Sequence, residues 1–398
     1  MKISNKFTRC FLFILEALFF MIIGAYLYKS GAISAFMTSK PILLIKKNLL
    51  GMNVVTFIPE YPDYSILDWD REYLMKLQPK FIFEGNNLTE WQKFKRSLLP
   101  EVNKILRFEK MPKDFPLKAK IVERVELKEV LREKILLETE EGLKIPLFFL
   151  IPKNKTFPLP AILVIPGHGV GKIGPAGLVD DYQNKNALYL AKNGFITVVP
   201  DLRGFGELGW KGVSSDPIYQ RDMEFNLIVG RNPIGVLIYD CNKIIEYMFT
   251  RKEIDTHKIG VTGCSLGGIL AGFIGALNEN IDAVFISATS FLEKDLRRDN
   301  VSLMRGDNVS LNSLLEFSPL TDKQTILQLI APRPLFIDID ESKINNKNDI
   351  IGYVRVKEIY GLYGKENNFK VIVHNRGHSY STKEAVNFFN KYLTSCNR

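Results

Sequence analysis

From Pro158 to the end of this 398-residue chain, short continuous apolar runs alternate with longer helical stretches. An apolar run without polar alternation is typical of a strand that helices bury on both faces. Helices are predicted between the runs, for example at 182–192 and 233–249. The pattern predicts a doubly wound α/β domain with a mostly parallel sheet. The runs predicted as strands are 161–165, 195–199, 258–262, 283–287, 334–339 and 369–373.

The preceding region, residues 30–157, is predicted to be an accessory region of helical and β-hairpin segments. A helix is expected around 90–106, and apolar alternation on both sides of Glu140-Glu141-Gly142 runs from 133 to 151. Two such alternations around a glycine-containing turn are typical of a hairpin. Antiparallel strands of this kind commonly precede a parallel sheet, here that of the predicted α/β domain at 158–398.

Residues 10–28 form an apolar stretch with a single charge, Glu16. As a helix this stretch would be about 28 Å long, close to the thickness of the hydrocarbon core of a bilayer. More basic residues precede it than follow it closely, so the positive-inside rule predicts a cytoplasmic N-terminus and an extracytoplasmic remainder. Residues 1–29 are therefore predicted to be a single-pass membrane anchor, a transmembrane helix. The alternative is a signal sequence cleaved near 31–35, after which the protein would be secreted.

The formal net charge of +9 comes mostly from the first fifty residues, which hold seven basic residues and one acidic residue. The remainder is nearly balanced and has no basic stripe with interleaved aromatic residues, so no nucleic-acid partner is expected. The four cysteines are scattered and have no metal-ligand spacing. The sequence therefore predicts neither a metal site nor a cofactor.

Gly263-Cys264-Ser265-Leu266-Gly267 lies between a predicted strand and a predicted helix and fits Gly-x-Ser-x-Gly. A sharp strand-to-helix turn leaves no room for side chains beside the serine, which explains the glycines. The alternative is a glycine-rich helix start that the serine caps. The position between strand and helix favours Ser265 as a catalytic nucleophile.

A serine nucleophile needs a base, and the chain contains four histidines. His378 follows the last predicted strand, at the same carboxyl edge of the sheet as Ser265, and is predicted to be the base. His374 ends that strand and is expected to pack, whereas His257 lies at the opposite edge. His168 ends the first strand of the α/β domain, where its backbone amide could join that of Leu266 in an oxyanion hole.

The acid of a catalytic triad is expected after the penultimate strand, between Ser265 and His378 in chain order. The end of that strand favours Asp340, with Glu341 as the alternative. Asp338 is expected to point into the strand, and Asp349 lies farther along, in the predicted helix that follows.

Several segments together resemble the acetyl-xylan-esterase and dienelactone-hydrolase-like branch of the α/β hydrolases, from about Trp91 to Tyr392. Pro166 to Lys172 is similar to the oxyanion loop of that branch, and Asp201 to Gly206 to its Asp-x-Arg-Gly-x-Gly turn. The glycine usual after the acid-bearing strand is absent, and Pro166 stands where histidine is common. The further matching segments are the nucleophile turn Gly263–Gly268 and Ala331–Pro334 before the acid-bearing strand.

The resemblance implies an α/β-hydrolase fold, Ser265 and His378 as catalytic residues, and an oxyanion hole formed by the Leu266 and His168 amides. The residues and the resemblance together predict a serine hydrolase that cleaves acyl esters through an acyl-enzyme intermediate. The expected substrate is a small-molecule or carbohydrate ester, such as an acetylated carbohydrate or a lipid-like ester. Two alternatives are a peptidase of the same fold and an inactive hydrolase fold that serves as a binding module. The long connections at 206–232 and 289–329 are expected to form a lid or the pocket.

Overall fold

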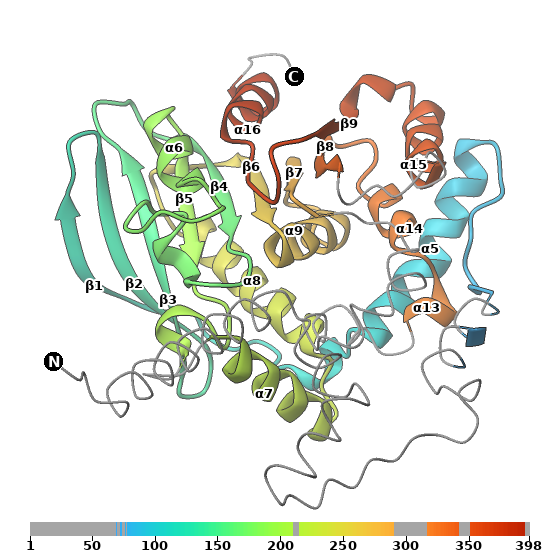
Figure 1. Ribbon diagram of the computed structural model, residues 1–398, viewed down its shortest axis with the longest axis horizontal. Coiled ribbons are helices and arrows are strands. Elements are labelled where there is room, and N and C mark those ends of the chain that lie inside the picture. The colour runs from blue at the N-terminus through green and yellow to red at the C-terminus, as the bar shows by residue number, and fades with distance from the viewer. Residues whose placement is uncertain are drawn as a thin grey trace, which may run out of the picture. The chain divides into compact units, whose positions relative to one another are not determined.

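One nine-stranded sheet runs through the described part of the chain, in the order β1-β2-β3-β5-β4-β6-β7-β8-β9 (Figure 1). The computed structural model describes residues 69, 72–73, 76, 78–209, 215–289, 317–341 and 351–394. The strands are β1 Lys118–Glu126, β2 Val130–Glu140, β3 Leu143–Pro152, β4 Leu159–Ile165, β5 Ile196–Pro200, β6 Ile254–Cys264, β7 Ala283–Ser287, β8 Leu335–Asp340 and β9 Phe369–His374.

The sheet is mostly parallel, which confirms the predicted fold class. All neighbours from β5 to β9 pair in parallel, whereas β1, β2, β3 and β5 pair with one another in antiparallel fashion. Every predicted strand of the α/β domain is present, and β6 begins four residues before its predicted start at 258. The predicted hairpin is β2 and β3, joined at Gly142, whose φ of +78° favours glycine. The hairpin is continuous with the parallel strands, and residue 157 lies between two strands of this one sheet.

Helices cover both faces of the sheet, and the side chains of β4 show the division. Leu163 and Ile165 belong to one hydrophobic cluster, and Ile162 and Val164 belong to the other. Alternate residues of a strand point to opposite faces, so β4 is buried from both sides. The first cluster includes α5 Leu88–Ile105, α8 Pro233–Phe249, α9 Leu266–Leu277, α14 Lys323–Gln328 and α15 Ile351–Leu362, and the second includes α6 Asn186–Lys192 and α16 Thr382–Phe389.

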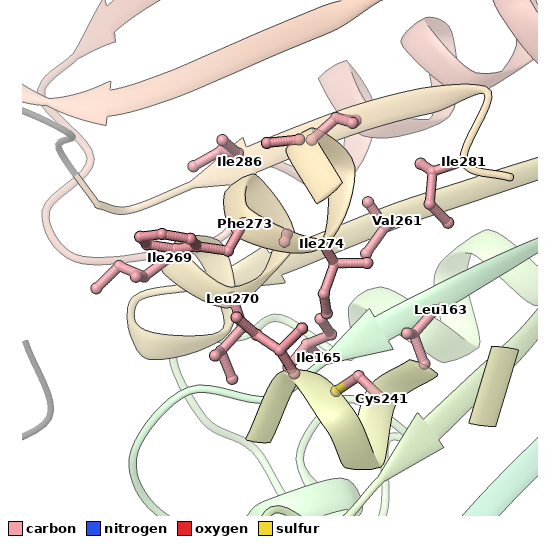
Figure 2. Packing of buried hydrophobic residues seen from close by; sticks show 14 of the residues in the cluster. Leu163, Ile165, Cys241, Val261, Ile269, Leu270, Phe273, Ile274, Ile281 and Ile286 are labelled. Carbon is pink, nitrogen blue, oxygen red and sulfur yellow. The ribbon is translucent and has the colours of Figure 1, made fainter. Parts of the chain in front are cut away.

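Helix α9 forms the centre of the first cluster (Figure 2). Its residues Ile269, Leu270, Phe273 and Ile274 lie among side chains of β4, β6, β7 and α8. The helix begins one residue after Ser265 and is almost wholly buried. An almost wholly buried helix therefore starts at the candidate nucleophile.

The predicted helix at 182–192 is shorter than expected and begins at Asn186. Asn184 and Lys185 have φ values of 53° and 52°, in the left-handed region, so a right-handed helix cannot include them. Residues 182–185 form a turn instead. The turn leaves Tyr182 and Gln183 outside the helix.

The predicted membrane segment at 10–28 lies outside the described residues. Within the part that the structure describes, no helix is long and apolar enough to cross a bilayer. The connection 206–232 contains α7 Ser215–Ile228, and the connection 289–329 ends in α13 Phe317–Leu320 and α14. Their role as a lid stays a prediction.

Candidate active site

Ser265 stands at the turn between β6 and α9 in a backbone conformation that residues with side chains rarely adopt. Its φ is 58° and its ψ is −120°. Strained conformations of this kind persist only where the surrounding structure enforces them, and they concentrate at functional sites. The Ser265 side chain makes no capping hydrogen bond to α9, and the residue is partly exposed between buried Cys264 and Leu266. The serine therefore projects from the turn rather than capping the helix.

The glycines around Ser265 permit close approaches between backbones. A Cβ on Gly263 would lie 2.1 Å from the Gly267 carbonyl oxygen, and one on Gly267 would lie 2.0 Å from the Ile165 carbonyl oxygen. Backbone atoms cannot move aside as a flexible side chain can. These close approaches, within the turn for Gly263 and against the end of β4 for Gly267, confirm the predicted reason for both glycines.

Cys264, the residue before the serine, is fully buried. Burial is the largest cause that raises the pKa of its thiol well above the usual value, and the charges of Asp181 and Asp338 act in the same direction. The thiolate is the reactive form of cysteine, so Cys264 stays neutral and unreactive at neutral pH. Ser265 is the candidate nucleophile of this turn.

The loop after β4 lies directly beside the serine, as the oxyanion prediction requires. A Cβ on Gly167 would lie 3.1 Å from the Cβ of Ser265. The Gly167 amide donates to Oε1 of Gln183 at 3.0 Å, and the Tyr182 hydroxyl donates to the His168 carbonyl at 2.7 Å. The Gly167 amide thus has a partner in Gln183, and the His168 amide is the loop donor that the sequence predicts for an oxyanion.

The local structure around the two predicted oxyanion donors, the Leu266 and His168 amides, is compatible with that role. Leu266 opens α9, where first-turn amides have no acceptor within the helix. The His168 ring packs edge-on against Phe205 and Tyr219, with centroid distances of 5.5 and 5.3 Å. The ring is engaged in this packing, so the contribution predicted for His168 is that of its backbone amide.

His378 lies on the exposed loop between β9 and α16, at the carboxyl edge of the sheet. Its ring centroid is 5.0 Å from that of Tyr182. The Tyr182 hydroxyl would lie 2.2 Å from a Cβ on Gly167, the residue that borders Ser265. Tyr182 thus lies beside the predicted base, His378, and beside the glycine that borders the predicted nucleophile, Ser265.

His374 is the other histidine near this edge, and both of its ring nitrogens face neighbours. Nδ1 accepts a hydrogen bond from the Arg376 amide at 3.2 Å. Nε2 lies 3.3 Å from Oδ2 of Asp338. Nδ1, which accepts a backbone N–H, is therefore not available to take a proton from a serine, and Nε2 is buried facing the Asp338 carboxylate. The geometry agrees with the expectation that His374 packs.

Asp340, the predicted acid, is the last residue of β8 and is buried. Its Oδ2 lies 3.7 Å from Nδ1 of His374, which is too long for a hydrogen bond. Glu341, the alternative, follows directly and is exposed. Asp349 lies outside the described residues. The assignment of Asp340 therefore stays a prediction.

Asp338 is fully buried on β8 and joins the end of the sheet to the His378 loop. Oδ2 accepts hydrogen bonds from the hydroxyls of Ser287, at 2.9 Å, and Ser381. Oδ1 accepts from Nη2 of Arg376 at 3.2 Å. Arg376 and Ser381 stand on either side of His378 in the chain, so Asp338 anchors both ends of the loop that carries the predicted base.

A buried ion pair braces the far end of the oxyanion loop. Nζ of Lys172 lies 2.5 Å from Oδ2 of Asp201, and both side chains are at most 1% exposed. The Lys172 amide also donates to Oδ1 of Asp201, at 2.8 Å, and the Lys172 ammonium contacts Glu207 as well. A buried pair of this kind needs such additional hydrogen bonds to offset desolvation. The pair fixes the Asp201–Gly206 turn against the oxyanion loop.

Sequence reasoning missed the roles of Tyr182, Gln183, Lys172 and Asp338. A signal for Lys172 was present, because it closes the loop segment that resembles the known branch. Tyr182 and Gln183 were assigned to a helix, which hid their contacts with the loop. Among the described residues, no group of three or more His, Cys, Asp or Glu side chains could hold a metal ion.

A sequence model described as the Abhydrolase family matches residues 65–391. The candidate hydrolase YtaP of Bacillus subtilis (strain 168) is 26% identical over 299 residues, which cover 71% of this chain and 95% of YtaP. Both findings agree with the predicted resemblance to α/β hydrolases.

Solved structures agree on the fold. A candidate acetyl xylan esterase of Bacteroides fragilis NCTC 9343 superposes with a TM-score of 0.65 at 22% identity, over 85% of this chain and 92% of that one. A glucuronoyl esterase from Solibacter usitatus gives a TM-score of 0.55 at 14% identity, over 79% of this chain and 98% of that one. The α/β-hydrolase fold predicted from the sequence is thereby confirmed.

Proposed function

Since this chain belongs to the Abhydrolase family, we propose that it is a serine hydrolase of carboxylic esters. The observation that carries the proposal is the state of Ser265, which is strained, partly exposed and uncapped at a strand-to-helix turn. A serine that only started a helix would use its hydroxyl as a cap. The strained turn instead presents the hydroxyl beside the oxyanion loop.

In the proposed mechanism, Oγ of Ser265 attacks the ester carbonyl while His378 removes its proton. The Leu266 and His168 amides stabilise the oxyanion, and Asp340 orients His378. The alcohol leaves with the proton that His378 returns. Water then attacks the acyl-enzyme with the help of the same histidine, which releases the acid and frees Ser265.

The proposed substrate class is a carbohydrate ester, with acetylated sugars as the first choice. Support comes from the names of two structural neighbours, one a candidate acetyl xylan esterase and the other a glucuronoyl esterase. The family membership and the fold agree with ester hydrolysis in general. A substrate panel must therefore determine which acyl group the protein removes.

A fluorophosphonate probe tests the mechanism, because it modifies only an activated serine. We expect wild-type protein to be labelled at Ser265 and Ser265→Ala to be unlabelled. The exposed Ser97→Ala on α5 is the matched control and should label like wild type. Absence of labelling in folded wild-type protein would favour the inactive binding module.

A panel of acetylated sugars, long-chain esters and amides should show turnover of the short esters, and turnover of amides alone would favour a peptidase.

We also propose that residues 10–28 anchor the protein in a membrane with the hydrolase domain outside the cytoplasm. The full-length chain is then expected to stay in the membrane pellet during detergent-free extraction at high pH. Mass determination of the extracted chain distinguishes an intact anchor from a cleaved signal sequence. Recovery of the uncleaved chain in the soluble fraction would contradict the anchor.

A further inference from the structure

The turn before α6 contacts both loops of the proposed site through one residue, Tyr182. The left-handed conformations of Asn184 and Lys185 delay the start of the helix. The backbone of Tyr182 is therefore outside α6, and its side chain reaches the oxyanion loop on one side and the His378 loop on the other.

The Tyr182 hydroxyl restrains the oxyanion loop beside an exposed stretch, Gly169 and Val170. It donates to the His168 carbonyl at 2.7 Å. A peptide unit is planar, so this bond fixes the direction of the peptide that follows His168, next to the His168 amide proposed as the oxyanion donor. Gly169 is exposed, has a φ of +125°, and an added Cβ would meet no atom within 4 Å. A side chain at Gly169 would have open space around it, and the hydroxyl contact restrains the residue before it.

The Tyr182 ring and carbonyl, together with the Asn184 side chain, hold the His378 loop. The Tyr182 ring lies at 32° to the His378 ring, with 5.0 Å between the centroids. The Tyr182 carbonyl accepts the Tyr380 amide at 2.9 Å, and the Asn184 side chain donates to the Tyr380 carbonyl at 2.8 Å. Tyr380 follows His378 by two positions, so these bonds fix the loop just beyond the histidine.

We infer that Tyr182 is a positioning residue that sets the oxyanion loop and His378 relative to each other. Its hydroxyl restrains the oxyanion loop, and its ring restrains the His378 side chain. The inference rests on the proposed function of Ser265 and His378, in which Tyr182 transfers no proton and forms no bond to the substrate. It assigns different effects to loss of the hydroxyl and loss of the ring.

Steady-state kinetics of the full-length chain with an acetyl ester separate the two effects. Tyr182→Phe removes only the hydroxyl, and we expect kcat to fall about five- to tenfold with KM within about twofold. Tyr182→Ala also removes the ring, and we expect kcat to fall about a hundredfold. Tyr189→Phe makes the same chemical change at an exposed site on α6 and should match wild type. A variant that loses melting temperature but keeps wild-type kcat would overturn the inference.

Hydrogen–deuterium exchange tests the restraint without relying on activity. Tyr182→Phe should speed exchange about threefold in peptides covering 166–172 and leave 376–382 unchanged. Tyr182→Ala should speed exchange in both peptides. Unchanged exchange at 166–172 in Tyr182→Phe would overturn the inference whether or not the protein hydrolyses esters. Failure of the fluorophosphonate probe would overturn the proposed function, and the exchange result would still decide whether Tyr182 holds the loops.

Discussion

Replacing His378 by alanine is expected to lower kcat for an acetyl ester by about 10⁴- to 10⁶-fold, with a much smaller change in KM. Without a base, the Ser265 hydroxyl stays protonated and attacks the carbonyl poorly. Residual turnover would come from binding and from the oxyanion donors, which do not depend on His378. His378 is exposed on its loop, so the variant should fold with little loss of stability. Steady-state kinetics and the rate of fluorophosphonate labelling measure the effect.

His374→Asn is the matched control, since His374 lies four positions earlier at the end of β9. Its Nδ1 accepts the Arg376 amide and its Nε2 faces Asp338, so its loss should reduce stability. In the folded variant, kcat should stay within about tenfold of the wild-type value. The opposite pattern, with a large kcat loss for His374→Asn and a small one for His378→Ala, would make His374 the base.

The nucleophile turn could be predicted because local sequence determines it. Gly263, Ser265 and Gly267 lie within five positions, and the apolar runs on both sides identify the strand and the helix. The helix at 233–249 was predicted with the bounds that the structure gives, because Asn232 caps it and Pro233 opens it. Local patterns of this kind depend on backbone sterics and capping, which the sequence displays directly.

The contacts that hold the site together could not be predicted in the same way. Asn184 and Tyr380 are 196 positions apart, and no local pattern relates them. The left-handed Asn184 and Lys185 lie in a polar stretch that reads equally well as the first turn of a helix. Tyr182 therefore looked like an ordinary residue of an amphipathic helix. Its role becomes visible only when the fold brings the two loops together.

The acid was the least determined part of the predicted triad, for a physical reason. Three carboxylates stand within four positions at the end of β8, and a strand end shifted by one residue changes which of them faces the site. The structure ends β8 at Asp340 and shows Asp338 engaged by four neighbours. The sequence alone could not show that Asp338 was already committed to those partners.

Asp338→Asn is expected to lower the free energy of unfolding by about 2 to 3 kcal/mol. The carboxylate only accepts hydrogen bonds, whereas an amide presents two donors on one side. The donors of Asp338 stand on both oxygens, with Arg376 at Oδ1 and the hydroxyls of Ser287 and Ser381 at Oδ2. Either orientation of the amide therefore turns its NH₂ group toward a donor. Arg376 is partly exposed and adds less than a fully buried partner would. Urea denaturation of both proteins at pH 7 measures the difference.

Asp340→Asn makes the same chemical change two positions later and separates anchoring from catalysis. If Asp340 orients His378, its amide variant should stay within about 1 kcal/mol of wild-type stability and lose about 10⁴-fold in kcat. Asp338→Asn should instead lose stability and, where folded, less of its kcat. The reversed result would make Asp338 the acid, because its Arg376 and Ser381 contacts already hold both sides of the His378 loop. Full kcat in both variants would leave Glu341 as the acid, which Glu341→Gln then tests directly.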